Sequence, residues 1–254
     1  QGFKAYDADE LLRFREIIAN EYGDVGLPAN DRALTARVAS ICILCGKGVY
    51  RLKKKDYLPC QLANKIYEYI ENSESTIFLT NTLFSIFELL AAGIDNKYFL
   101  QGVLHELFAD KFVFRRDYIS KDVDVTSVYS AVVDFIKKSN FPVSKAQIQD
   151  AFPGITEIVI NFSVSDPNVL NYFGEYLHAS KLNILDNEKS YLYNVLDRLT
   201  SDGEAHHNRE LYEIISRQKP EILTRNAAMY PFSAFSIVEF LFRDKFQFSR
   251  PYVA

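Results

Sequence analysis

The stretch LFADKFVFRRDYIS at residues 107–120 returns as LFRDKFQFSRPYVA at residues 241–254. Aligned without a gap, eight of the fourteen positions are identical. An internal copy constrains the fold strongly, because each copy has to find a similar structural environment. The sequence therefore predicts a modular fold in place of one continuous core.

Two fainter copies of the tyrosine-centred part of this stretch precede the strong ones. Tyr118 and Tyr252 mark the strong copies, and Tyr57 and Tyr176 mark the faint ones. Successive tyrosines are 61, 58 and 76 residues apart. This spacing predicts four structural units of one kind. We name them repeats 1 to 4 and place them at residues 1–58, 59–120, 121–184 and 185–254.

Repeats 2 to 4 each open with an apolar helical face. In repeat 2, Leu62, Ile66, Tyr69 and Ile70 recur at helical spacing. The same pattern predicts first helices within segments 127–140 and 190–201. Second helices are expected within segments 82–93, 144–152 and 209–218, and third helices within segments 96–108 and 232–242.

Local signals mark where these helices begin and end. Ser144 and Gln147 form a capping-box pattern, and Gly93 is placed as a C-cap. After the third helix, segments 111–119 and 245–253 are short, aromatic and alternating, which predicts strand.

Repeat 1 follows a looser version of this order. Its pattern predicts two helices and a strand, at residues 8–23, 30–44 and 49–53. Asn30 or Asp31 would cap the second helix, and Gly46 and Gly48 would end it.

Three short helices followed by a strand, repeated along the chain, resemble the winged helix, a helix-turn-helix that leads into a β-wing. The chain also resembles the tandem helix-turn-helix regions of bacterial regulatory proteins. The resemblance implies a mainly α fold with short β-wings (α+β class), arranged as a tandem array. It also implies DNA contact through the third helix. Units this small are expected to pack on their neighbours, with the four tyrosines at the seams.

Composition limits the class and the setting of the protein. Apolar residues make up 48% and charged residues 24% of the chain, as in packed globular proteins. No apolar run approaches the ~18–20 residues that span a bilayer, and no secretory leader is recognisable, so no membrane partner is expected. Three cysteines favour a reducing, cytoplasmic setting. The first residue, Gln1, favours a piece of a longer protein, whose remainder is a candidate partner.

Basic residues recur just before the marked tyrosines. They are Arg51, Lys53, Lys54 and Lys55 in repeat 1, Lys111, Arg115 and Arg116 in repeat 2, and Lys245 and Arg250 in repeat 4. On a wing, such side chains would contact DNA phosphates. The alternative is that they solvate an edge strand and discourage aggregation. Repeat 3 has Phe173 and Gly174 at this place, which predicts a spacer without phosphate contacts.

The helix predicted to begin near Asn30 is a second candidate interface. Arg32 and Arg37 are side-chain types that read bases, while Leu34 and Val38 form the core-facing pair. The alternative is an ordinary exposed helix face.

Catalytic, metal and cofactor chemistry leave no linear signature here. The C-x-x-C of Cys42 and Cys45 lacks a second pair of ligands, which favours buried apolar cysteines. His206 and His207 stand in a turn-like stretch and are weak metal candidates by themselves. No nucleophile elbow, phosphate loop or paired-carboxylate motif is present. The sequence predicts neither an enzyme nor a bound cofactor or metal.

Two functions compete on these grounds. The first is an intracellular DNA-binding protein of the kind that regulates transcription, which contacts phosphates through repeats 1, 2 and 4. The second is a protein-interaction scaffold whose winged helices no longer bind DNA. The net charge of −4 favours the scaffold, because DNA affinity depends on phosphate neutralisation. The basic residues recurring at one position favour DNA.

Overall fold

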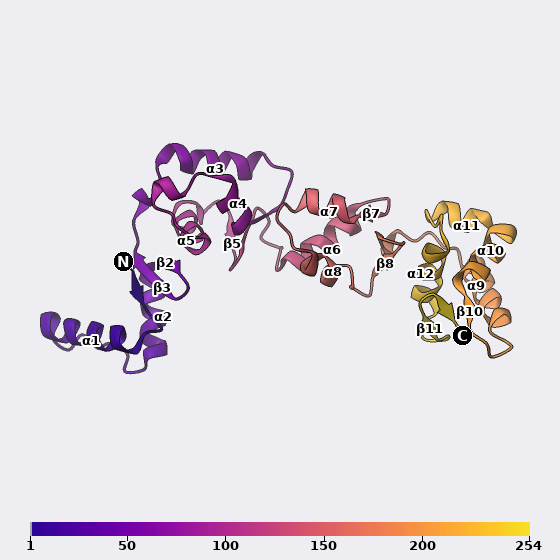
Figure 1. Cartoon of the computed structure of the whole chain (residues 1–254), viewed down its shortest axis with the longest axis horizontal. Coiled ribbons are helices and arrows are strands. Elements are labelled where there is room, and N and C mark those ends of the chain that lie inside the picture. Colours follow the sequence, from indigo (N-terminus) through magenta and orange to yellow (C-terminus); the bar gives the residue numbers. More distant parts are fainter. Residues whose placement is uncertain (1) are drawn as a thin grey trace. The chain divides into compact units, whose positions relative to one another are not determined.

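The computed structural model describes residues 2–254, except for the side chain of Lys55. The chain divides into two compact units (Figure 1). Unit 1 comprises Gln1–Asp124 with Phe152–Gly154, and unit 2 comprises Val125–Ala151 with Ile155–Ala254. Both units combine helices with small antiparallel sheets, in agreement with the predicted α+β class.

Repeat 2 displays the element order most fully: helix, strand, two helices and two further strands. Its elements are α3 (Cys60–Asn72), β4 (Ile77–Leu79), α4 (Thr80–Ile86), the 3-10 helix η2 (Leu90–Ala92), α5 (Lys97–Phe108), β5 (Val113–Phe114) and β6 (Tyr118–Ser120). The last strand, β6, lies between β4 and β5 in a three-stranded antiparallel sheet. The first strand of the repeat therefore pairs with the last one, which closes the repeat on itself.

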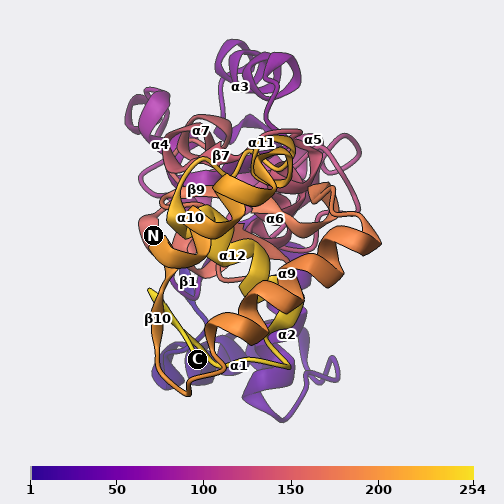
Figure 2. The ribbon, with the colours of Figure 1, turned by 90° about the vertical axis from the view of Figure 1, so that its right-hand side faces the viewer.

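Repeats 3 and 4 have the same order and the same sheet topology. Repeat 3 contains α6 (Val128–Lys138), β7 (Val143–Ser144), α7 (Lys145–Ala151), α8 (Glu157–Ser163), β8 (Val169–Asn171), β9 (Glu175–His178) and the 3-10 helix η3 (Ala179–Lys181). Repeat 4 contains α9 (Asp186–Leu199), β10 (His206–His207), α10 (Asn208–Gln218), α11 (Pro220–Arg225), α12 (Pro231–Phe242), β11 (Phe248–Ser249) and β12 (Tyr252–Val253). Figure 2 shows α9, α10 and α12 of repeat 4 packed beside one another.

Repeat 1 begins with its first strand and has the remaining elements. These are β1 (Phe3–Lys4), α1 (Ala8–Tyr22), α2 (Asp31–Ile41), β2 (Cys42–Gly46), β3 (Val49–Leu52) and the 3-10 helix η1 (Lys55–Tyr57). The sheet order β1–β3–β2 matches the other three sheets. Asn30 caps α2 as predicted, since its side chain accepts hydrogen bonds from the backbone N–H groups of Arg32 and Ala33.

The predicted structure of four segments is wrong. The helix expected over residues 30–44 ends at Ile41, and residues 42–46 form β2, because Cys42 turns to an extended backbone. Segments 111–119 and 245–253 each form a hairpin of two strands in place of one strand. Gly93, with φ 76°, ends the 3-10 helix η2 in place of α4. The capping box of Ser144 and Gln147 is confirmed by reciprocal hydrogen bonds of 2.8 and 3.2 Å.

The two strong sequence copies have matching surroundings. In unit 1, Phe108 and Phe112 lie 5.4 and 5.6 Å from Tyr67 of α3, measured between ring centroids. In unit 2, Phe242 and Phe246 lie 5.8 and 5.4 Å from Tyr193 of α9. The copied phenylalanines therefore pack on the first helix of their own repeat in both cases. This aromatic triad explains why these residue types recur.

Strand pairing corrects the two faint copies. Tyr118 and Tyr252 pair with Leu79 and His207, each the last residue of its repeat's first strand. In repeat 1, the partner of Lys4, the last residue of β1, is Val49, so the prediction that Tyr57 is the equivalent residue is wrong. Tyr57 lies after the sheet, in η1, where its ring contacts Phe99.

The same test moves the match in repeat 3 by one residue. Ser144, the last residue of β7, pairs with Glu175, and Tyr176 pairs with the preceding Val143. Tyr176 is buried, as expected of a seam, but Tyr252 is 46% exposed. The expectation that all four tyrosines fill seams is therefore wrong for Tyr252.

One packing arrangement recurs inside each unit. We call the helix that directly precedes each hairpin the pre-hairpin helix: α2, α5, α8 and α12. In unit 1, β2 of repeat 1 packs on α5 of repeat 2, and in unit 2, β8 of repeat 3 packs on α12 of repeat 4. The first repeat of each unit thus covers the pre-hairpin helix of the second.

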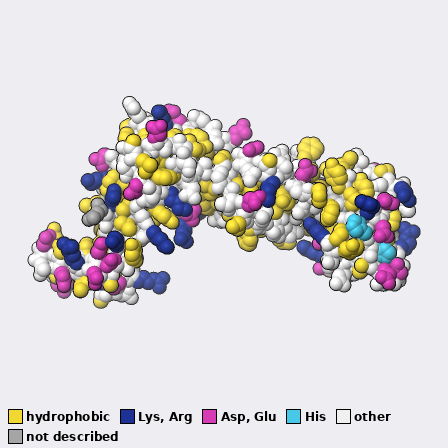
Figure 3. Space-filling model, in the orientation of Figure 1, with side chains coloured by type: hydrophobic (Ala, Val, Ile, Leu, Met, Phe, Trp, Pro, Cys, Tyr) yellow, Lys and Arg dark blue, Asp and Glu magenta, His cyan; other side chains and the backbone are white. Residues whose placement is uncertain are grey.

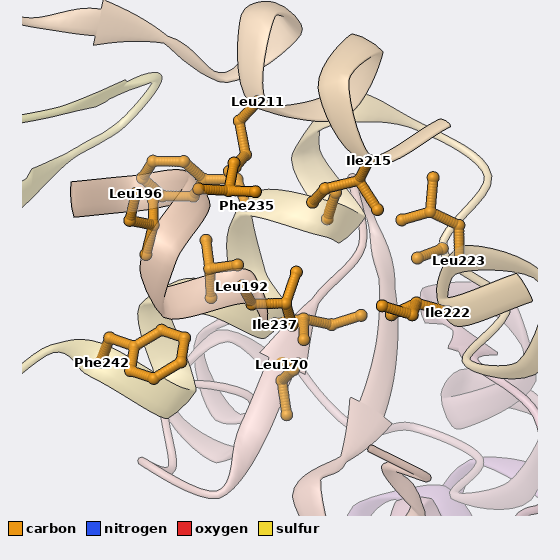
Figure 4. Packing of buried hydrophobic residues seen from close by; sticks show 14 of the residues in the cluster. Leu170, Leu192, Leu196, Leu211, Ile215, Ile222, Leu223, Phe235, Ile237 and Phe242 are labelled. Carbon is orange, nitrogen blue, oxygen red and sulfur yellow. The ribbon is translucent and has the colours of Figure 1, made fainter. Parts of the chain in front are cut away.

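This arrangement merges the hydrophobic cores within a unit. Ile43 and Cys45 of β2 belong to the same buried cluster as the helices of repeat 2. In unit 2, Leu170 of β8 belongs to the cluster formed by α9 to α12, and Figure 4 shows it below Ile237 of α12. Burial of these strand residues removes apolar surface from water, which is the main force that holds a helix and a neighbouring hairpin together.

Candidate nucleic-acid interface

The pre-hairpin helix α2 presents both of its predicted arginines to solvent. Leu34 and Val38 are buried, with exposures of 1% and 6%, which confirms the predicted core-facing pair. Arg32 and Arg37 lie on exposed positions of the same helix. The Arg37 guanidinium donates a long hydrogen bond, 3.5 Å, to the carbonyl oxygen of Gly26.

The basic run after β3 divides into engaged and free side chains. The guanidinium of Arg51 lies 5.0 Å above the Phe99 ring of α5. Lys53 forms a 2.7 Å ion pair with Glu106, also of α5. Lys54 is exposed and has no ion pair within the described part of the chain, while the side chain of Lys55 lies outside the description. Two predicted phosphate contacts thus hold repeat 1 on repeat 2.

The hairpin of repeat 2 carries its arginines at the turn between β5 and β6. Arg115 and Arg116 are exposed, and the Arg116 side chain reaches 90% exposure. Asp117 lies 3.9 Å from Arg116 and 3.3 Å from Lys97 of α5. Lys111, in the preceding turn, is exposed and lies 3.9 Å from Asp110. Figure 3 shows Lys and Arg side chains gathered beside α5 and this hairpin.

The cations of repeat 4 are less available. Lys245 is exposed, but Arg250 forms a 2.8 Å ion pair with Glu239. The Arg250 guanidinium also lies 5.8 Å above the Phe235 ring. An arginine that already satisfies a carboxylate gains little from a phosphate, because the carboxylate repels the incoming anion.

One exposed cation escaped the sequence prediction. Lys47 occupies the turn between β2 and β3, the same place as Arg115 and Arg116 in repeat 2. Gly48 follows it with φ 71°, a left-handed conformation that glycine adopts without strain. Apolar residues on both sides of Gly46–Lys47–Gly48, at 42–45 and 49–50, are a hairpin signal that could have revealed it.

Two pre-hairpin helices lack access to a DNA groove. The faces of α5 and α12 are covered by the hairpins described above. On α5, Gly102 lies so close to β2 that a Cβ there would be 2.3 Å from Cγ2 of Ile43. The other two pre-hairpin helices differ in chemistry: α2 exposes arginines, whereas α8 exposes Ile158 and Phe162.

The remaining polar clusters have structural roles. His206 lies between Asp202 and Glu210, at 3.0 and 3.1 Å. Its hydrogen bond to Asp202, and then that to Glu210, raises the pKa of His206 above its ordinary value. No group of three or more His, Cys, Asp or Glu side chains suited to a metal ion occurs among the described residues. The thiols of Cys42 and Cys45 have pKa values raised by burial, as expected of apolar cysteines.

Comparison with protein-family models, with curated proteins and with solved structures gave no match. None of the helices in the described part of the chain combines the length and the apolar character needed to cross a lipid bilayer.

Proposed function

We propose that the protein is a tandem winged-helix protein that binds double-stranded DNA through unit 1. In each repeat, the helices with the three-stranded sheet and terminal hairpin have the order of a helix-turn-helix followed by a wing. The observation that carries the proposal is the exposure of Arg32 and Arg37 on α2, the one pre-hairpin helix of the described chain that presents arginines at an open face.

In this proposal α2 enters the major groove. Its exposed face combines the two arginines with Ala33, Ala36 and Ser40, whose small side chains permit close approach to base edges. Lys47 at the turn of the β2–β3 hairpin and Lys54 beyond it supply phosphate contacts, as do Arg115 and Arg116. Arg51, Lys53 and Arg250 are left out, because their charges are used within the protein.

The experiment is a duplex-binding titration at two salt concentrations, with wild type and two charge-reversal variants. We expect Arg32→Glu with Arg37→Glu to weaken binding at least about tenfold at low salt, because two cations become anions at the groove. The matched control is Lys189→Glu with Arg217→Glu, which makes the same charge change at exposed sites of unit 2. Equal losses in both variants, or an affinity that does not fall as salt rises, would contradict the proposal.

A protein-interaction scaffold is the second candidate. The observation that favours it is the exposed pair Ile158 and Phe162 on α8, which are 80% and 68% exposed. Apolar side chains at helical spacing on an open face are typical of a protein contact and unsuited to phosphates. DNA binding and protein binding are compatible with each other, since the arginines lie in unit 1 and the apolar pair lies in unit 2.

A further inference from the structure

Unit 2 contains a groove where β8 packs beside α12. It has a volume of about 250 Å³. Three elements line it: β8 with Val169, the C-terminal half of α12 with Phe240 and the adjoining Arg243, and β11 with Phe248. Both strands are edge strands, because the sheet orders are β7–β9–β8 and β10–β12–β11.

The two covered pre-hairpin helices differ at a residue that lines this groove. Gly102 of α5 and Ser236 of α12 are equivalent, since each is the sixth residue of its helix in the aligned copies. Gly102 lets β2 press onto α5, whereas Ser236 carries a side chain whose Oγ donates a 2.6 Å hydrogen bond to the carbonyl oxygen of Asn171. The serine therefore bonds the hairpin of repeat 3 to α12 and lines the groove beside it.

The β11 edge offers unused backbone groups to this groove. Gln247 and Ala254 exchange two hydrogen bonds, of 2.8 and 2.9 Å. In an antiparallel ladder the next pair, Phe248 with Val253, is then not hydrogen-bonded. The N–H and C=O of Phe248 therefore point away from β12, towards the edge. On the β8 side, the N–H of Val169 is already donated to Asp166 at 2.9 Å. Hence β11 is the better template for an added strand.

The charges at the groove select the partner's side chains. The carboxylate of Glu239 is held by Arg250 at 2.8 Å, which leaves that pair neutral. Arg243 is exposed and lies 5.7 Å above the Phe240 ring. It has no ion pair within the described part of the chain. One unpaired cation beside apolar rings suits a carboxylate next to an apolar side chain. A single unpaired cation is a poor match for the dense charge of a nucleic-acid backbone, which binding proteins neutralise with several cations.

We propose that unit 2 binds an extended peptide segment of a partner protein by adding it as a strand to β11. The backbone of Phe248 supplies the ladder hydrogen bonds. An acidic side chain of the peptide faces Arg243, and an apolar side chain two residues along, on the same face of the added strand, packs on Phe240. The site is separate from the proposed DNA contacts, all of which belong to unit 1.

The test uses the full chain and two labelled synthetic peptides of about seven residues, one built on a Val-Val-Glu-Glu repeat and one on a Val-Val-Lys-Lys repeat. Each face of the extended peptide then carries both apolar and charged side chains. We expect the glutamate peptide to bind at least about tenfold more tightly. Arg243→Glu is expected to reverse that preference. Lys245→Glu, an exposed cation two residues away and outside the groove, is expected to leave it unchanged.

A second measurement separates strand addition from charge attraction alone. Methylation of alternate backbone nitrogens of the glutamate peptide removes its ladder donors, and we expect binding to be lost although its charge is kept. The proposal is overturned if the glutamate peptide does not bind, if both peptides bind equally, or if methylation has no effect. It is also overturned if duplex DNA binds wild type and loses affinity in Arg243→Glu but not in Lys245→Glu.

Discussion

In unit 1 the hairpin of repeat 1 lies against a bare glycine of α5, whereas in unit 2 the hairpin of repeat 3 is bonded to a serine of α12. The linkers differ too. Lys53, just after the hairpin of repeat 1, forms an ion pair with Glu106 of repeat 2 at the surface. At the junction of repeats 3 and 4, Arg225 of α11 donates to the carbonyl oxygen of Asn183 and pairs with the buried Glu188 of α9. In both units a hairpin packs on the pre-hairpin helix of the next repeat, but different contacts hold it there.

The largest expected effect breaks the linker contact of unit 2. Arg225 donates to both carboxylate oxygens of Glu188 and to the carbonyl oxygen of Asn183. Arg225→Ala leaves the Glu188 carboxylate buried without its partner, so we expect a loss of about 3 kcal/mol in the free energy of unfolding. The free energy of unfolding is measured by urea denaturation, and the local stability of α9 is measured separately by hydrogen exchange.

The matched variant in unit 1 is Lys53→Ala. Its ion pair with Glu106 is partly solvent-exposed, and such pairs contribute about 0.5 kcal/mol. If Arg225→Ala and Lys53→Ala lowered the free energy of unfolding equally, the two junctions between repeats would be held with similar strength, and the proposed difference between the units would be wrong.

The next effect concerns the seat of β2 on α5. An added Cβ at Gly102 would lie 2.3 Å from Ile43 Cγ2 and 3.0 Å from the carbonyl oxygen of Leu44. Alanine at a helix interior ordinarily stabilises by about 1 kcal/mol relative to glycine. Here we expect Gly102→Ala to destabilise unit 1 by about 2 kcal/mol, because β2 has to move. A rise in stability on denaturation would refute the close contact.

Ser236→Ala is the corresponding change in unit 2. It removes the hydrogen bond to Asn171 without adding volume, so we expect a smaller loss of about 1 kcal/mol. If Ser236→Ala destabilised the protein more than Gly102→Ala, the closer packing of hairpin on helix would not be in unit 1.

The smallest effect is a pH dependence confined to unit 2. The pKa of His206 is raised by its hydrogen bonds to Asp202 and Glu210, and the pKa values of both carboxyls are lowered by the bond to His206. The stability that unit 2 gains from protonated His206 is fully present below the ordinary pKa of histidine. It is lost as pH rises through the raised pKa. The stability gained from ionised Asp202 and Glu210 is fully present above the ordinary pKa of these carboxyls, about 4. It is lost as pH falls through their lowered pKa values.

Unit 2 is therefore expected to gain most from this triad between about pH 5 and 6.5. In His206→Gln the melting temperature of unit 2 should fall less between pH 6 and about pH 8.5 than in wild type. His105→Gln, at an exposed site of unit 1, serves as the control. An unchanged pH profile in His206→Gln would show that the triad does not contribute.

Features set by a few neighbouring residues could be predicted well. The cap at Asn30, the capping box of Ser144 with Gln147, and the buried pair Leu34 and Val38 all depend on residues within one or two helical turns. The duplicated stretch also predicted its own repetition in space, because its phenylalanines pack locally on the first helix of the repeat.

Features that depend on register could not be predicted as well. The sequence prediction matched Tyr57 and Tyr176 to Tyr118 and Tyr252 because all four are tyrosines. A shift of one residue in a strand, however, changes every partner across the ladder. Strand pairing assigns those places to Glu175 and Val49. For the same reason Lys47 was missed as the cation at the turn of the first hairpin.

The amino-acid sequence by itself determined the α+β class, the caps at Asn30 and Ser144, and the copied aromatic packing, since these depend on short-range geometry and side-chain type. Only the tertiary structure decided which of the basic residues are free. Arg51, Lys53 and Arg250 are engaged by Phe99, Glu106 and Glu239, residues that lie on other elements of the fold. Their charges are identical in the sequence to those of Arg32 and Arg115, and distance to a partner is the physical quantity that separates them.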